Sequence, residues 1–406
     1  MASSELTVAD AVARLRAALQ PIAGTERCAL ADASGRVLAE GVHATLDVPA
    51  MANAAMDGYA LRLADAAPGA RLRVVGRALA GHPYAGRVSA GEAVRVMTGA
   101  ALPDGADAIL MQEDARLAGD TVEVAGAVTP GMHIRPRGEQ LRAGDTVLPR
   151  GRRLRSYDVG LAAAAGAAQV GVMRRLRVGV ISTGDELTDP QQGAAPGRAQ
   201  YDGNRPMLLA ALRRAGHDTQ DLGIVADRED ALRAALAAAG EARVDVLIAS
   251  GGVAQGDADF VRRVAGEFIA LNIRPGRGLV HGRIGDGASA FQFFGLPGNP
   301  VAAYVMHRLV VAPLLAHLTG ADERTDMPLT LRLPLAEPAK TRGGRIDWRR
   351  VRLVQRDGGL VIEPLKLQGS AMLLTLSGGD ALAAIGPGMA YEAGELVEVI
   401  PLDALE

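Results

Sequence analysis

Acidic and glycine residues gather directly after an apolar run at 244–248, which has the character of a buried strand. The loop that follows holds a serine, three glycines and two carboxylates: Ser250, Gly251, Gly252, Gly256, Asp257 and Asp259. Glycines let main-chain N–H groups approach a ligand, and a loop between a strand and a helix often binds an anion. Carboxylates repel an anion unless a divalent cation lies between them. Taken alone, the loop could equally be a tight turn with Asp259 as a helix cap.

Further charged residues extend this chemistry. Asp185, Glu186 and Asp227 each follow another apolar run, and Arg274 and Arg277 flank a Pro-Gly pair as a stiff basic fork suited to phosphate or another oxyanion. Carboxylates for a divalent cation together with arginines for phosphate are the components of phosphoryl or adenylyl chemistry. The alternative is that the acids cap helices and the arginines are merely solvated.

Other catalytic motifs are missing from the sequence. It has no Gly-x-x-x-x-Gly-Lys-Ser/Thr loop, and no Gly-x-Gly-x-x-Gly follows an expected strand. The seven histidines show no zinc-ligand spacing, and no serine lies in a Gly-x-Ser-x-Gly elbow. These absences argue against a P-loop enzyme, a dinucleotide-binding enzyme, a zinc enzyme and a serine hydrolase.

Composition limits the class of protein. The 406 residues, 49% of them hydrophobic, are enough for two to four domains, and a net charge of −2 gives no reason to expect nucleic-acid binding. The single cysteine, Cys28, excludes a disulfide framework within the chain. The N-terminus has no signal-peptide pattern, and the Ala-rich run 161–168 is too short to span a bilayer. We expect a cytoplasmic protein that has no membrane partner.

The elements that must position these residues lie between 176 and 322. Apolar strand patterns alternate there with helix patterns at 205–215, 228–239 and 301–318, which predicts a doubly wound parallel sheet with helices on both faces. Asp202, Asp227 and Gly240 are expected at helix ends. In such a sheet ligands bind beyond the carboxyl ends of the strands. The loops 183–186, 227 and 250–259 should meet there with a rigid turn: Pro297, Gly298, Asn299 and Pro300.

The rest of the chain divides into three parts. One helix pattern covers 6–19, with Thr7 or Ser4 as a possible cap, and another covers 156–168, capped by Ser156 or Asp158. Together they suggest an elongated framework domain made of 1–44 and 140–175. Alternating strand patterns between 45 and 139 predict an inserted β-rich domain. Short strands after 323 predict a small C-terminal β-barrel up to residue 406.

Six motifs together resemble one family, and the resemblance covers essentially the whole chain. They are Ala-Met-Asp-Gly-Tyr-Ala at 55–60, Met-Thr-Gly-Ala at 97–100, Ile-Arg-Pro-Arg-Gly-Glu at 134–139, Ser-Thr-Gly-Asp-Glu-Leu at 182–187, Ser-Gly-Gly-Val at 250–253 and Gly-Leu-Pro-Gly-Asn-Pro at 295–300. This pattern resembles the molybdopterin molybdenumtransferases, the MoeA-like proteins, and the E domain of gephyrin. The resemblance implies four domains, a homodimer and a Mg²⁺-dependent reaction in which adenylylated molybdopterin and molybdate give molybdenum cofactor and AMP.

The resemblance also implies roles for particular residues. Asp57 and Thr98, from the β-rich domain, would complete the site on the sheet of the partner subunit. The family's functional acids are matched by Asp185, Glu186, Asp227 and Asp259. Three of them, Asp185, Asp227 and Asp259, are expected to hold the metal. Arg274 and Arg277 stand where the family usually has Lys-Pro-Gly-Lys, and they keep the positive charge.

Partners and alternatives follow from the same comparison. A molybdopterin adenylyltransferase could supply the substrate, and molybdenum enzymes or their chaperones could receive the product. One alternative function is that adenylyltransferase itself, which is usually a single domain, so the long flanking regions argue against it. The other is a non-catalytic molybdopterin-binding scaffold, against which the intact set of acids argues.

Overall fold

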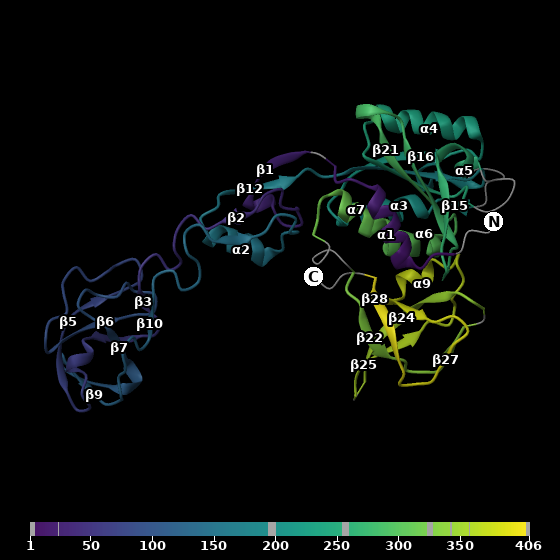
Figure 1. Ribbon diagram of the computed structural model, residues 1–406. Helices are drawn as coiled ribbons and strands as arrows, with labels where there is room; N and C mark the ends of the chain where they lie inside the picture. Colours follow the sequence, from purple (N-terminus) through teal and green to yellow (C-terminus); the bar gives the residue numbers. More distant parts are fainter. Residues whose placement is uncertain are drawn as a thin grey trace.

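The computed structural model describes residues 5–22, 24–193, 200–253, 260–322, 328–341, 343–356 and 358–402. The molecule is elongated (Figure 1), with a small β-rich domain at one end and a larger α/β body with the C-terminal sheet at the other. A narrow framework region connects them. The domain limits given above remain predictions.

A six-stranded sheet forms the centre of the large body. Its strands in spatial order are β16 (Asp218–Val225), β13 (Arg177–Thr183), β17 (Val246–Ser250), β21 (Phe291–Leu296), β20 (Gly278–Ile284) and β18 (Glu267–Ala270). The first four are parallel, but β20 and β18 are antiparallel to their neighbours. The prediction of an all-parallel sheet is therefore wrong, because only short links join β18 to β20 and β20 to β21, whereas a parallel crossover needs about a dozen residues.

Helices cover both faces of this sheet, as predicted. Successive residues of a strand point to opposite sides, so each strand has apolar side chains to bury on both faces. One core joins Val178, Val246 and Phe294 to helices on the first face; the other joins Ile181 and Leu247 to helices on the second. The helices are α3 (Asn204–Arg214), α6 (Pro300–Met306) and α7 (Ala312–Leu318) on the first face, and α4 (Glu229–Glu241) and α5 (Phe260–Ala265) on the second. A small parallel pair, β14 (Leu187–Thr188) and β15 (Gln200–Tyr201), lies outside the main sheet.

Helix α1 (Val8–Ala18) begins at Thr7, whose side chain accepts a hydrogen bond from the Asp10 backbone N–H at 3.1 Å. Its buried residues Ala11, Val12 and Leu15 belong to the core of the first sheet face and lie against α7. The apolar stripe of α1 is therefore covered by the α/β body. The grouping of this helix with the helix pattern at 156–168 in one framework domain remains a prediction.

The predicted long helix after residue 300 is continuous but contains a π-helical stretch, His307–Val311, between α6 and α7. The span Pro300–Leu318 is long and apolar enough to cross a membrane, yet 78% of its apolar 18-residue window is buried inside the fold. It is accordingly the core helix of the first sheet face.

His307 gives this helix a pH-dependent contribution to stability. Burial, and to a lesser degree the charge of Arg308, lowers the pKa of His307 from 6.5 to about 4. The unfolded chain therefore binds a proton that the folded chain does not, and stability falls as the pH drops from 6.5 toward 4. From pH 7 to pH 5 we expect wild type to lose about 2 kcal/mol more unfolding free energy than His307→Leu. Urea unfolding at both pH values measures this difference, and equal losses in the two proteins would contradict it.

Two antiparallel pairs hold the framework together across the insertion. β1 (Thr25–Ala29) pairs with β12 (Gln169–Met173), and β2 (Val42–His43) pairs with β11 (Thr146–Leu148). Helix α2 (Ser156–Ala164) packs into the same small core. Its N-cap is Arg155, and the Asp158 carboxylate accepts the Arg155 backbone N–H at 3.0 Å. The expected caps at Ser156 and Asp158 are therefore wrong: Asp158 is the third helical residue of a capping box.

The inserted domain is β-rich, as predicted. Its sheet runs β7 (Ala108–Met111), β4 (Gly58–Leu61), β6 (Glu92–Val96), β5 (Arg71–Ala78), β9 (Thr121–Val124) and β8 (Ala115–Ala118), with a separate pair β3 (Asn53–Ala54) and β10 (Ile134–Arg135). The C-terminal sheet runs β19 (Ile273–Arg274), β24 (Ile346–Arg356), β26 (Ala381–Ile385), β28 (Leu396–Pro401) and β22 (Leu331–Pro334), with β25 (Gly359–Pro364) beside β24. The pair β23 (Ala339–Lys340) and β27 (Ala390–Tyr391) and the short helix α9 (Leu374–Ser377) complete this region. Its first strand, β19, belongs in sequence to the α/β body and pairs in parallel with β24, which joins the two parts.

Candidate functional site

Two of the predicted acids, Asp185 and Asp227, meet at the carboxyl edge of the sheet. β13 and β16 are parallel neighbours, so Asp185 and Asp227, which follow them, lie at the same edge. The Asp227 backbone N–H donates to Asp185 Oδ1 at 3.2 Å. Burial raises the pKa of Asp227, and the nearby charges of Asp185 and Glu186 raise it further, against a backbone hydrogen bond from Asp185 that lowers it. These three carboxylates form a cluster of negative charge, and a bound cation would reduce the repulsion between them.

Asp227 is not the cap of α4, contrary to expectation. Arg228 occupies the N-cap position with no capping bond from its side chain, and the helix begins at Glu229. The helix also runs one residue beyond Gly240, to Glu241. The Asp227 carboxylate is therefore not used in starting the helix.

The loop after β17 makes a tight approach to β13. Gly251 has φ +112°, and a Cβ there would lie 2.4 Å from the Thr183 carbonyl oxygen, so only glycine fits. Its N–H donates to the Leu296 carbonyl at 3.0 Å. Ser250 is buried and Gly252 is half-buried. Gly256, Asp257 and Asp259 lie outside the described residues.

The predicted Pro-Gly-Asn-Pro turn lies beside this loop. Ser250 Oγ donates to the Pro297 carbonyl at 3.3 Å, and Gly298 lies close to Gly251. Asn299 is the N-cap of α6 without a side-chain capping bond, and Pro300 is the first helical residue. Proline is favoured there because its missing N–H would have had no helical partner. The three predicted loops and the turn therefore converge, as far as their described residues reach.

A buried polar network behind the site was missed from the sequence. Asn204 Nδ2 donates to Ser250 Oγ at 2.8 Å and to the Gly298 carbonyl at 2.6 Å, which ties the glycine loop to the turn. Asp202, expected only as a cap, accepts the backbone N–H groups of Asn204 and Arg205 and also the Ser182 hydroxyl at 3.0 Å. The polar run 202–205 at the start of α3 was the available signal.

Arg205 anchors this network electrostatically. It is 5% exposed and donates to three carboxylates, those of Asp189, Asp202 and Asp221. Burial alone would lower the pKa of Arg205, but the hydrogen bonds with these carboxylates raise it well above its usual range. The start of α3 is thereby held in place next to the glycine loop.

The arginine fork lies at the edge of the same site. Arg274 and Arg277 are exposed, and the turn between them packs on the start of α6, since a Cβ on Gly276 would lie 3.7 Å from Pro297 Cγ. Arg277 Nε donates to Glu5 Oε1 at 3.3 Å. The fork is therefore placed beside the Pro-Gly-Asn-Pro turn.

Asp57 and Thr98 come together, but far from the sheet. Asp57 Oδ1 accepts both the backbone N–H and the hydroxyl of Thr98, each at 2.7 Å. These bonds, with the charge of Arg95, hold the pKa of Asp57 below its usual value. Gly58 fixes the position, because a Cβ there would lie 2.0 Å from the Leu110 carbonyl oxygen. The pair lies in the β-rich domain, at the opposite end of the molecule from the sheet (Figure 1).

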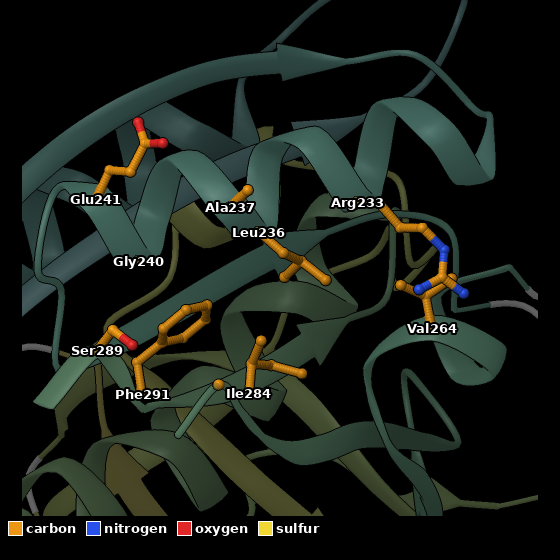
Figure 2. A pocket seen from close by; sticks show the side chains of 10 residues that line it. Arg233, Leu236, Ala237, Gly240, Glu241, Val264, Ile284, Ser289 and Phe291 are labelled. Carbon is orange, nitrogen blue, oxygen red and sulfur yellow. The ribbon is translucent and has the colours of Figure 1, made fainter. Parts of the chain in front are cut away.

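The acids at the sheet edge suit a hard cation in their chemistry. Across the described ranges, no group of three or more His, Cys, Asp or Glu side chains is placed to hold a metal. Of the predicted ligands, Asp185 and Asp227 are adjacent, whereas Asp259 is outside those ranges. An open groove of about 530 Å³ elsewhere is lined by Leu236, Val264, Ile284 and Phe291 of the α4 face (Figure 2). It lies toward the amino ends of the strands and is separate from this site.

Comparison with known proteins covers nearly the whole chain. Residues 6–166 match the MoeA N-terminal region (domain I and II), 179–317 a probable molybdopterin binding domain, and 332–402 the MoeA C-terminal region (domain IV). The molybdopterin molybdenumtransferase of Haemophilus influenzae is 33% identical over 94% of this chain and 95% of its own length. That of Synechococcus elongatus is 34% identical over 98% of both chains. The crystal structure of a molybdopterin biosynthesis moeA protein from Pyrococcus horikoshii has 27% identity and a TM-score of 0.83, covering 98% of this chain and 100% of its own. The chain therefore belongs to the molybdopterin molybdenumtransferase family.

Proposed function

We propose that this protein inserts molybdate into adenylylated molybdopterin and releases AMP, giving molybdenum cofactor. The observation that carries the proposal is the convergence of Asp185, Asp227 and the loop 250–252 with the turn 297–300 at one sheet edge, in a chain of this family. Acids, backbone N–H groups and a basic fork together suit a ligand that carries phosphate. The single cysteine supports a cytoplasmic setting.

The C-terminal sheet is proposed to close toward a barrel, and the bridge between Leu335 and Ile362 supports this closure.

Within this function the acids would bind Mg²⁺, and Asp185 and Asp227 are its ligands in the proposal, with Asp259 as the third. Magnesium, when bound, supplies positive charge for phosphate oxygens. Glu186 adds negative charge beside them, and the arginine fork would orient the anionic ligand. Asp57, ionised and fixed by Thr98, would act later, at molybdate insertion.

The direct test uses purified protein, adenylylated molybdopterin, molybdate and Mg²⁺. We expect AMP release together with cofactor that activates a molybdenum-free apoenzyme. Activity with ATP and unmodified molybdopterin instead would indicate the adenylyltransferase. Ligand binding without either reaction would indicate a scaffold.

The protein should be a homodimer. The β-rich domain, which holds Asp57, and the sheet, which holds the other acids, lie at opposite ends of the molecule (Figure 1), so a second chain would have to bring them together. Exposed apolar side chains at Met51, Met56 and Tyr157 offer surface for such a contact. Sedimentation velocity at micromolar concentration should give twice the chain mass of 42.0 kDa. A single species at the monomer mass would contradict this.

The arginine fork should bind the anionic ligands. Replacing Arg274 and Arg277 together with alanine should weaken binding of molybdate or the pterin by about 2–4 kcal/mol. This is less than two full charged hydrogen bonds at roughly 1.5–3 kcal/mol each, because both arginines are exposed to solvent. Replacing both with lysine should keep most of the activity, because the charge is retained. Titration calorimetry measures the first effect and AMP release the second. A lysine pair as poor as the alanine pair would show that the forked geometry of arginine is required.

A further inference from the structure

Three chain segments meet next to the arginine fork, and main-chain hydrogen bonds hold them there. The Leu6 N–H donates to the Ala270 carbonyl at 2.9 Å, and the Asn272 N–H donates back to the Leu6 carbonyl at 2.8 Å. The Ile346 N–H of the C-terminal sheet in turn donates to the Asn272 carbonyl at 3.2 Å. The N-terminal segment is therefore fixed beside the chain that leads into Arg274, with the C-terminal sheet opposite.

This arrangement brings one carboxylate between two guanidinium groups. Arg345 donates from Nε to Glu5 Oε2 at 3.0 Å and from its Nη2 to Glu5 Oε1, which is a bidentate pair. Arg277 donates from Nε to the same Oε1 at 3.3 Å. The hydrogen bonds from Arg345 are the main reason that the pKa of Glu5 lies below its usual value. The Glu5 side chain is 27% exposed and that of Arg277 is 51% exposed, so solvent and solutes reach the cluster.

The Glu5 carboxylate binds the guanidinium groups of Arg277 and Arg345 with the geometry that phosphate and other oxyanions use when they bind arginine. We propose that Glu5 is an affinity-setting residue of the site: it occupies Arg277 and Arg345, and an oxyanion group of the ligand must compete with it. The proposal rests on the function above, in which Arg277 binds an anion. Because main-chain hydrogen bonds hold the neighbouring Leu6 in place, the charge of Glu5 stays beside the fork and opposes the anion whether or not the ligand is bound.

The test is titration calorimetry of the full-length protein with molybdate and, separately, with inorganic phosphate, at low ionic strength. Glu5→Gln should bind at least one of these anions about 5-fold more tightly than wild type, because one opposing charge is removed. The anion that gains identifies which ligand group uses the subsite. Added salt should shrink the gain, since salt screens exposed charges. Glu5→Asp, which keeps the charge, should bind like wild type.

A matched control exists on the same pair of segments. Glu267 on β18 accepts Arg14 of α1 at 2.9 Å, so Glu267→Gln breaks another ion pair between the N-terminal segment and the α/β body, away from the fork. It should leave the affinity for both anions unchanged. In an Arg277→Ala background, Glu5→Gln should lose most of its effect.

Unchanged or weaker anion affinity in Glu5→Gln, the same gain in Glu267→Gln, or no binding in any variant would each overturn the proposal. The cofactor assay separates this result from the function itself. A protein that forms cofactor but shows no Glu5 effect loses only this inference. A protein that forms no cofactor but shows the gain loses only the proposed reaction.

Discussion

Replacing Asp227 with asparagine should lower the rate of AMP release by at least about 100-fold, which is the scale of loss when a group that stabilises transition-state charge is removed. The variant should also no longer respond to Mg²⁺. The reason is the charge of the cluster: burial and the charges of Asp185 and Glu186 raise the pKa of Asp227. Asparagine keeps the size of the side chain but supplies no negative charge for a cation.

AMP release is measured by chromatography across a Mg²⁺ titration, with the binding of adenylylated molybdopterin measured in parallel. Asp218→Asn is the matched control, since Asp218 begins the same strand, β16, at its opposite end. The control should release AMP at the wild-type rate. If Asp227→Asn did so too, with the same Mg²⁺ dependence, Asp227 would not belong to a metal site.

The meeting of the acids could be predicted because it follows from topology. Parallel strands end at one edge, so the sequence predicts that Asp185 and Asp227 lie together, and the hydrogen bond between them confirms this. Strand direction was harder to predict. An apolar run such as 278–284 has the same pattern in a parallel and an antiparallel strand, so periodicity did not reveal that β20 is antiparallel. The signal was the shortness of the links to its neighbours, which leaves no room for the crossover that a parallel strand needs.

Contacts between distant segments could not be predicted from local pattern. Asn204 has the local sequence of a helix start, yet its amide binds Ser250 and Gly298, which are 46 and 94 residues away. Glu5 lies in a short polar stretch, and its partner Arg345 is 340 residues away. In each case the residue's role depends on which segments the fold places beside it, and hydrophobic periodicity carries no such information.

Asp57 belongs to a different domain from the sheet acids. It is hydrogen-bonded to Thr98 in the β-rich domain, which lies at the far end of the molecule from the sheet (Figure 1), so the two halves of the proposed site cannot meet within one chain. In the proposed dimer each site takes Asp57 from one chain and the sheet acids from the other. Asp57→Ala should accordingly bind adenylylated molybdopterin and yield almost no finished cofactor, because the Thr98-bound carboxylate is missing from every site.

Mixed dimers test directly whether Asp57 of one chain and the sheet acids of the other form one site. A dimer of one Asp57→Ala chain and one Asp227→Asn chain has one dead site that carries both changes and one site that carries neither. Random exchange puts half of the chains into such dimers, so two inactive proteins should together recover about a quarter of wild-type cofactor formation. Subunit exchange is followed by native mass spectrometry of differently tagged chains.

The control mixture is Asp185→Asn with Asp227→Asn. Both residues lie at the same sheet edge, so every site in that mixture carries at least one change and no activity should return. Recovery in the first mixture alone would place Asp57 opposite the partner's sheet. If verified mixed dimers of Asp57→Ala and Asp227→Asn stayed inactive, the two residues would not serve one shared site, and Asp57 would need a function within its own domain.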